Sequence, residues 1–485
     1  MLIDKRIERL IKLIYKLSLE DSVNKEELVL DLNCSIRTVD YTLAELQQTF
    51  VTKSSSMKIE LKPDSILQLS GKDELVIREM LHRLYLQDDM VRFFLEAIAH
   101  QQKANTFVEK HFISRATFFR KLKNINTWLR DYQLSFDLRS LQLKGQERQI
   151  RQFYYIVLFE ITNGIFWPFP FDKQLIEDRL DAIVSTFDLQ LSNTQYESFL
   201  YLLGSQYHRT SQGHYVDQYD SRFPEEIRQK IIDVCEPFLI NIPENNRRGE
   251  EDFLLMTVVN APFTYHPMLL LEQNIAINKK HQTAEWLLTT RFLEVFDQIF
   301  PKALKGTTRT HIAGHLLQLH ITNRYHPVPF TTYKDVTHGK AIAKQHPALN
   351  NVVEQISEKI ASIEQAPNQL LKIRYLLLLY TFVDINKFHP PLEMLIVSGE
   401  GPVYEEMISE KINDYVPFQL KMVTSAMQQH ADSSFPIIVT DTPLLKKSQQ
   451  NVLYIHYPLT FSDLHKIHEK CERLHCQRLD YSFSL

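Results

Sequence analysis

Two stretches of this sequence share one pattern: Leu67-Gln68-Leu69-Ser70-Gly71 and Leu141-Gln142-Leu143-Lys144-Gly145. Each lies at the end of a longer segment, and the two longer segments have the same order of elements. Each follows a short helical segment, a turn, and a longer helical segment that begins at a serine. Serine is a favoured N-cap residue, and this order of elements is typical of a helix-turn-helix with a wing. The sequence therefore predicts two structural modules of one kind.

In the first module we expect a short helix over residues 24–32, a turn at residues 33–34 and a longer helix over residues 35–50. Apolar residues recur at helical spacing along the longer helix. A hairpin wing is expected around Pro63-Asp64, because apolar and polar residues alternate on both sides of it. If the longer helix enters a DNA major groove, the residues that could reach the DNA are Arg37, Thr38 and Tyr41.

The second module repeats this order with more positive charge. A short helix is expected over residues 106–112, with Ser114 capping a long helix that runs to about Arg130. Residues 101–150 carry ten Lys and Arg against four Asp and Glu, whereas the whole chain has a net charge of −4. A single basic helix is more often a solvated face, but duplication of the whole module favours DNA binding. The side chains expected to carry most of the contact are Arg115, Thr117, Arg120, Lys121 and Lys123.

Composition indicates a soluble, mainly helical protein. Of 485 residues, 44% are hydrophobic and 24% charged, and only 11 are Gly, which favours long helices over glycine-dependent turns. Four Cys provide no disulfide framework. The first residues lead into a charged amphipathic helix, so we expect no signal peptide, no membrane span and a cytoplasmic location.

The rest of the chain separates into helical and α/β parts. Long apolar-rich helical segments follow the second module in two sets, and from Pro390 short apolar runs alternate with helical segments, as in a small, mainly parallel sheet. The expected fold is mainly α and multidomain. We expect five domains: residues 1–70 and 71–148 for the modules, 149–269 and 270–388 for two helical domains, and 389–485 for the α/β domain.

This order of parts resembles the Mga/AtxA family of virulence transcription regulators of Gram-positive bacteria. The segment Leu143-Lys144-Gly145-Gln146-Glu147-Arg148-Gln149-Ile150-Arg151 is similar to a Leu-x-Gly-x-Glu-x-x-Ile-Arg tag of such proteins. The resemblance implies a regulator, usually an activator, that binds promoter DNA as a dimer or larger oligomer. It also implies that the helical domains are phosphotransferase-system regulation domains (PRDs) and that the last domain is EIIB-like.

The resemblance directs attention to histidines that phosphocarrier proteins of the phosphotransferase system could phosphorylate. The candidates are His208, His266 and His320. Such a histidine needs an imidazole that is exposed to the carrier. A histidine near a helix end is nevertheless more often structural or merely exposed.

We expect no catalytic residue, no cofactor and no metal site. A working EIIB domain of this type carries a Cys after its first strand, but this chain has Ser398-Gly399-Glu400-Gly401 there. We therefore expect a degenerate domain that serves association or regulation. Two metal-like spacings, His311/His315 and His468/Cys471/His475, are expected by chance among 19 His.

Two other function classes stay open. An RNA-binding antiterminator with the same helical domains would need a compact RNA-binding module in place of the two helix-turn-helix modules. A phosphotransferase component would need an acceptor Cys or a catalytic His. The DNA-binding regulator accounts for more of the sequence than either.

Overall fold

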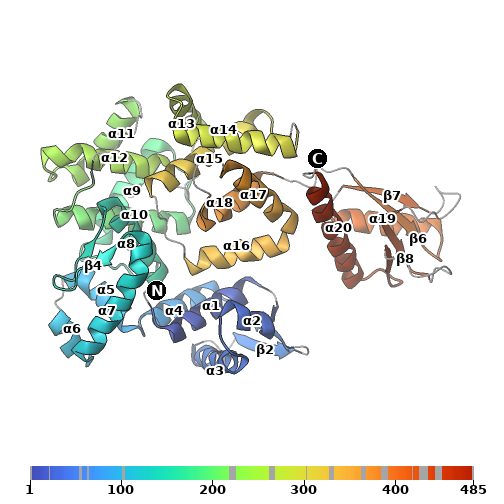
Figure 1. The fold of residues 1–485 in the computed structure, drawn as a ribbon, viewed down its shortest axis with the longest axis horizontal. Coiled ribbons are helices and arrows are strands. Elements are labelled where there is room, and N and C mark those ends of the chain that lie inside the picture. Colours follow the sequence, from blue (N-terminus) through green and yellow to red (C-terminus); the bar gives the residue numbers. More distant parts are fainter. Residues whose placement is uncertain are drawn as a thin grey trace. The chain divides into compact units, whose positions relative to one another are not determined.

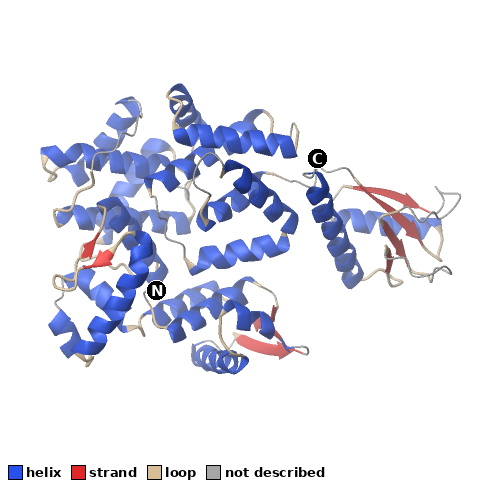
Figure 2. Cartoon of the chain, viewed as in Figure 1, coloured by secondary structure: helices blue, strands red, loops and turns tan. Residues whose placement is uncertain are grey.

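The structure, a computed structural model, is dominated by helices (Figures 1 and 2). It describes residues 3–20, 22–53, 57–62, 65–100, 104–217, 225–260, 268–301, 303–326, 332–361, 367–383, 391–417, 419–424, 435–442 and 451–482. The chain divides into two compact units. The first comprises Met1–Thr290, Arg309–Ala341 and Gln369–Ile373, and the second comprises Arg291–Thr308, Ile342–Asn368 and Arg374–Leu485. The predicted mainly α, multidomain fold is confirmed.

The first helix-turn-helix module ends in a small antiparallel sheet, as predicted. Its elements are α1 (Lys5–Leu19), β1 (Val23–Asn24), α2 (Lys25–Asp31), α3 (Ile36–Lys53), β2 (Lys58–Lys62) and β3 (Ile66–Ser70). Strand β3 lies between β1 and β2 and pairs Leu67 with both Val23 and Leu61. Asn24 caps α2, because its side chain accepts a hydrogen bond from the backbone N–H of Glu26 at 2.8 Å. The short tag of the sequence is thus the central strand of the wing.

The second module has the same order with a shorter wing. Its elements are α4 (Glu74–Tyr85), α5 (Asp89–His100), α6 (Ala104–Lys110), α7 (Arg115–Leu129), a 3₁₀ turn (Arg130–Tyr132), β4 (Ser135–Phe136), β5 (Leu143–Lys144) and α8 (Glu147–Thr162). Three buried rings, Phe93, Phe107 and Phe118, pack with centroids 4.9–5.9 Å apart. Such aromatic packing joins α5, α6 and α7 into one core.

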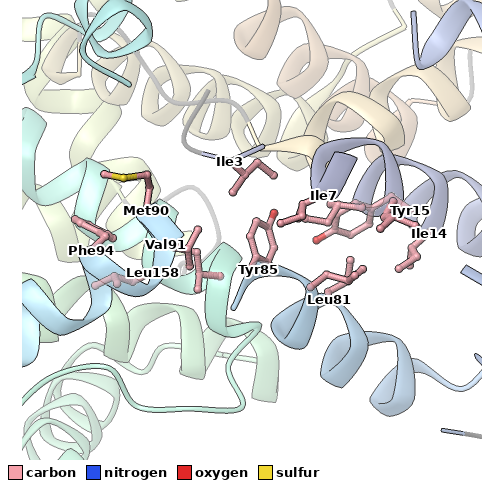
Figure 3. Close-up of a cluster of buried hydrophobic side chains, with 14 of the residues drawn as sticks. Ile3, Ile7, Ile14, Tyr15, Leu81, Tyr85, Met90, Val91, Phe94 and Leu158 are labelled. Atoms are coloured by element: carbon pink, nitrogen blue, oxygen red, sulfur yellow. The ribbon is translucent and has the colours of Figure 1, made fainter. Parts of the chain in front are cut away.

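A continuous hydrophobic core connects the two modules. Figure 3 shows buried side chains of α1, α4, α5 and α8 in this cluster. The hydroxyls of Tyr15 and Tyr85 both donate to the same carboxylate oxygen of Glu160, at 3.1 and 2.9 Å. Each buried Leu or Ile side chain contributes about 1.5–3 kcal/mol. The modules are therefore parts of one packed body.

Helices follow α8 through the middle of the chain. They are α9 (Lys173–Phe187), α10 (Asn193–Ser211), α11 (Glu225–Leu239), α12 (Glu244–Asn260), α13 (Met268–Lys280), α14 (Ala284–Ile299), α15 (Gly306–Tyr325), α16 (Tyr333–Gln345), α17 (Pro347–Ile360) and α18 (Gln369–Phe382). The helices are interrupted at residues 240–243, between α11 and α12, and residues 244–249 form the first turns of α12. Pro243 lies just before the helix, where proline is tolerated, and Arg247 pairs with Glu251 one turn later.

The C-terminal part of the second unit is the predicted α/β domain. Its elements are β6 (Leu392–Val397), α19 (Pro402–Tyr415), β7 (Leu420–Thr424), β8 (Ile437–Thr440), β9 (Val452–Tyr454) and α20 (Phe461–Ser482). The strands pair in the order β7-β6-β8-β9, and the described pairs are all parallel. In a parallel sheet the loops that follow the strands meet at one edge, so the loops after β6, β8 and β9 share that edge.

Candidate nucleic-acid interface

The turns of the two helix-turn-helix motifs have the same backbone geometry. The turn residue is Asn33 in the first and Phe112 in the second, with left-handed φ values of 47° and 55°. The N–H of Cys34 donates to the carbonyl of Val29 at 3.2 Å, and the N–H of Ile113 donates to that of Val108 at 3.0 Å. Both turns therefore end the short helix by one hydrogen-bonding scheme. The duplication inferred from sequence is present in three dimensions.

Serine caps the longer helix in both modules. The hydroxyl of Ser35 accepts from the N–H of Thr38 at 3.3 Å, and that of Ser114 accepts from the N–H of Thr117 at 3.1 Å. The serine and threonine hydroxyls also bond to each other, at 2.9 and 2.8 Å. Thr38 and Thr117, expected to reach DNA, are thus half-buried and engaged in the helix caps.

Helix α7 presents an exposed stripe to solvent. Ala116, Arg120, Lys123 and Thr127 are exposed and lie four, three and four residues apart, so they share one face. Arg115 is also exposed, at the first residue of the helix. The opposite face is buried through Phe118, Leu122, Ile125 and Leu129. Arg115, Arg120 and Lys123 are therefore placed as the sequence predicted, available to phosphate or to base edges.

Lys121 is placed differently. Its Nζ lies 2.6 Å from a carboxylate oxygen of Asp89 on α5, and Asp89 also pairs with Arg92. Burial alone would raise the pKa of the Asp89 carboxyl, but hydrogen bonds and charges from Lys121 and Arg92 lower it. One residue along a helix is a rotation of about 100°, which turns Lys121 away from the face of Arg120. Lys121 is half-buried and its charge pairs with Asp89, which holds α7 on α5, so it is less available to DNA than Arg120 or Lys123.

Helix α3 presents a weaker version of the stripe. Arg37 and Tyr41 are exposed as predicted, with the guanidinium 5.8 Å from the centroid of the Tyr41 ring. The acidic Asp40 and Glu45 on the same helix form ion pairs with Lys25 and Arg6. Among the side chains that the structure describes, α3 therefore exposes one cation, Arg37, where α7 exposes three, Arg115, Arg120 and Lys123.

The wing of the first module contributes cations that the sequence reasoning missed. Lys58 and Lys62 on β2 are exposed, at the two ends of the strand. In the second wing Arg139 is exposed, whereas Lys144 pairs with Asp137 at 2.7 Å. The wing cations alternate with apolar residues, a pattern that indicated a hairpin. The polar positions of that alternation face outward, and this could have identified the exposed cations from sequence.

His208 on α10 is buried. Its ring lies 6.0 Å from that of Tyr154 and 5.7 Å from that of Phe169, and its Nε2 is 3.1 Å from the side-chain nitrogen of Gln212. Burial, reinforced by the neighbouring Arg209 cation, lowers the pKa of His208 to about 4. The imidazole is neutral at physiological pH and closed off from a carrier protein.

His320 on α15 is also buried. Its Nδ1 lies 2.7 Å from the hydroxyl of Thr289, and burial lowers its pKa to about 3. His266 lies outside the described residues. The exposure that phosphotransfer requires is thus absent at both described candidates in this conformation.

Burial of His320 predicts a pH-dependent stability. A histidine in an unfolded chain has a pKa of about 6.5. Because the folded pKa is lower, the unfolded state takes up a proton first as pH falls, so the contribution of His320 is fully present above about pH 6.5 and is lost toward pH 3. Between pH 7 and pH 5 the loss should be about 2 kcal/mol from this one group.

Thermal unfolding at pH 7 and pH 5 tests this expectation. The variant His320→Gln should lose less stability than the unaltered protein over this range. His465→Gln is the control, since the His465 side chain is 64% exposed. Equal pH dependence of all three proteins would contradict the prediction.

The start of α8 carries a buried ion network. The guanidinium of Arg151 donates to both carboxylate oxygens of Glu250 on α12, each at 2.7 Å, and to Glu147 at 3.1 Å. Arg209 on α10 donates to both oxygens of Glu147, at 2.9 and 2.7 Å. Arg151 and Glu250 have no exposed side-chain surface. The Leu-x-Gly-x-Glu-x-x-Ile-Arg tag therefore fastens the segment after the second wing to α10 and α12.

In the C-terminal domain, carboxylates of the chain itself occupy the loop after β6. The N–H of Gly399 donates to Asp441 at 2.9 Å, and the hydroxyl of Ser398 donates to the same carboxylate. The N–H of Ser398 donates to the buried Glu405 at 3.0 Å. Backbone N–H groups in such a loop are the donors that would cradle a phosphate. Here the carboxylates of Asp441 and Glu405 accept hydrogen bonds from the donors that a phosphoryl group would need.

Comparison with known proteins agrees with these observations. The family model described as the Mga helix-turn-helix domain matches residues 73–158, which span α4 to most of α8. A Streptococcus pneumoniae protein named as a trans-acting regulator is 22% identical over 473 residues, covering 89% of this chain and 90% of the relative. The capsule synthesis positive regulator AcpA of Bacillus anthracis is 19% identical, covering 91% and 94%. Over the described residues, we find no helix with the length and hydropathy that a membrane span requires.

Proposed function

Because this chain is a transcription regulator of the Mga/AtxA type, we propose that it binds promoter DNA through both winged helix-turn-helix modules and acts as an activator. The observation that carries the proposal is the exposed stripe of α7, with Arg120 and Lys123 on the face opposite the core. Helix α3 supplies a second, weaker contact through Arg37 and Tyr41. The name of the AcpA relative supports activation over repression.

A binding titration on duplex DNA across a salt series tests the proposal. The purified protein is titrated onto its own upstream region and onto unrelated duplex of equal length. Tight binding to the upstream region whose affinity falls steeply with salt is expected, because Lys and Arg displace counterions from phosphates. Absence of duplex binding at every salt concentration, together with binding to structured RNA, would favour the antiterminator.

Regulation by phosphocarrier proteins is a further part of the proposal, at His208, His266 or His320. The family resemblance supports it. Since His208 and His320 are buried, a carrier would reach them only after the surrounding helices separate. Acid-labile phosphate on the unaltered protein, lost in one of three His→Ala variants, would identify the acceptor, and no labelling would rule out all three.

We also propose that the EIIB-like domain serves self-association. Val403 near the start of α19 and Phe461 at the start of α20 are 82% and 81% exposed. The ring centroids of Tyr404 and Tyr457 lie 4.7 Å apart, which links the first turn of α19 to the loop before α20. Large apolar side chains gathered at one sheet edge are typical of a protein interface.

Charged substitutions at this edge should dissociate the oligomer. Val403→Glu with Phe461→Glu is expected to convert a dimer to a monomer, because each places a charge in an apolar contact. Sedimentation velocity measures the change. Ile240→Glu, at an exposed apolar residue after α11, is the control. An unchanged sedimentation coefficient for the double variant would place the interface elsewhere.

A further inference from the structure

Phe112 is the most exposed of the large hydrophobic side chains described, at 96%. It occupies the turn of the second helix-turn-helix motif, two residues before Ser114, the cap of α7. The residue that precedes it, His111, is held inward by the Glu96 carboxylate at 2.7 Å, and Lys110 binds the same oxygen at 3.0 Å. The two preceding side chains are thus paired with a carboxylate on α5, whereas the ring of Phe112 is almost fully exposed.

The backbone at Phe112 makes this placement costly. Its φ of 55° lies in the left-handed region, which a bulky side chain rarely adopts, whereas asparagine adopts it readily. The equivalent turn residue in the first module is Asn33, at a φ of 47°. The same turn is therefore made at lower cost by a polar residue in this very chain. Folding gives no reason for an exposed phenylalanine at this position.

The position suits contact with DNA. In a helix-turn-helix complex the N-terminal residues of the second helix contact base edges in the major groove. Phe112 lies two residues before the cap of that helix and three residues before the exposed Arg115. The thymine 5-methyl group is the apolar feature of the major groove, and phenylalanine is among the side chains that pack on it.

We propose that Phe112 is an apolar contact to DNA, packing against the 5-methyl group of a thymine in the major groove that α7 enters. The inference rests on the proposed function and extends it. It adds a residue outside the exposed stripe of α7 and names the base feature that this residue would recognise. Arg120 and Lys123 supply attraction to any duplex, whereas Phe112 favours thymine at one site.

The test replaces Phe112 with the residue that the first module uses. Phe112→Asn should raise the melting temperature by about 2 °C, because asparagine accepts the left-handed turn. It should also weaken binding to the upstream duplex by about tenfold. A purely structural role would move stability and binding in the same direction. Ile240→Asn, a substitution at an exposed apolar residue outside both modules, should leave binding unchanged.

A second duplex, with deoxyuridine in place of thymine, removes the methyl groups alone. The unaltered protein should bind it about tenfold more weakly than the thymine duplex, and Phe112→Asn should bind both equally. Unchanged affinity of Phe112→Asn, or equal sensitivity of both proteins to the loss of the methyl groups, would overturn the inference and leave the proposed function standing. If the unaltered protein bound no duplex, the proposed function would fail and this inference with it.

Discussion

Replacing Arg120 and Lys123 together with alanine is expected to weaken binding to the upstream duplex by about 100-fold while the protein stays folded. Both side chains are exposed on one face of α7, so their removal leaves no cavity and no unpaired buried charge. The slope of log affinity against log salt should become shallower by about 2, since each phosphate contact accounts for about 0.9. A binding titration at four salt concentrations measures both quantities.

Lys121→Ala is the matched control, because it removes the same kind of charge from the adjacent position of the same helix. The Asp89–Lys121 ion pair is partly exposed, so its loss should lower the free energy of unfolding by about 1 kcal/mol or less. The salt slope should stay close to that of the unaltered protein. If Lys121→Ala reduced binding as much as the double variant does, the assignment of the exposed stripe as the reading face would be wrong.

The largest loss of stability is expected from Arg151→Met. The substitution preserves much of the side-chain volume but leaves the fully buried Glu250 carboxylate without its cation, which costs about 3–5 kcal/mol. It also removes the guanidinium that lies 4.6 Å from the centroid of the Phe253 ring. Hydrogen exchange of α8, α10 and α12 should accelerate, because the network joins these three helices. Thermal unfolding and hydrogen exchange measure the two effects.

The double variant Arg151→Met with Glu250→Gln separates the charge from the packing. It should recover part of the lost stability, since a neutral amide is less costly to bury unpaired than a carboxylate. A loss below 1 kcal/mol for Arg151→Met alone would contradict the prediction, because it would mean that water reaches the Glu250 carboxylate. Arg291→Met, at a pair in which Glu294 is 56% exposed, is the control and should change little.

The local elements could be predicted from sequence because their signals are local. Ser35 and Ser114 mark the starts of α3 and α7, and the apolar spacing within each helix identifies its buried face. The parallel sheet of the last domain followed from short apolar runs separated by helical segments. The break before α12 has a local signal as well, since Pro243 lies at the start of a helix, where proline is tolerated.

Which charged side chains are available to a ligand could not be predicted in the same way. Arg120 and Lys121 are neighbours with similar chemistry, but Lys121 meets Asp89, a residue 32 positions earlier in the chain. The burial of His208 and His320 likewise depends on helices that pack around them from elsewhere. Partners this distant leave no periodic signal in one sequence.

Four features followed from the amino-acid sequence: the duplication of the helix-turn-helix modules, the mainly helical fold, the parallel C-terminal sheet and the absence of an acceptor Cys after β6. They depend on residue spacing and identity, which a chain has before it folds. The folded protein was needed to show that Arg151 is buried between Glu147 and Glu250, that Asp441 accepts hydrogen bonds from the loop after β6, and that the ring of Phe112 is exposed. Each of these depends on which groups meet or fail to meet across the fold, and only packing decides that.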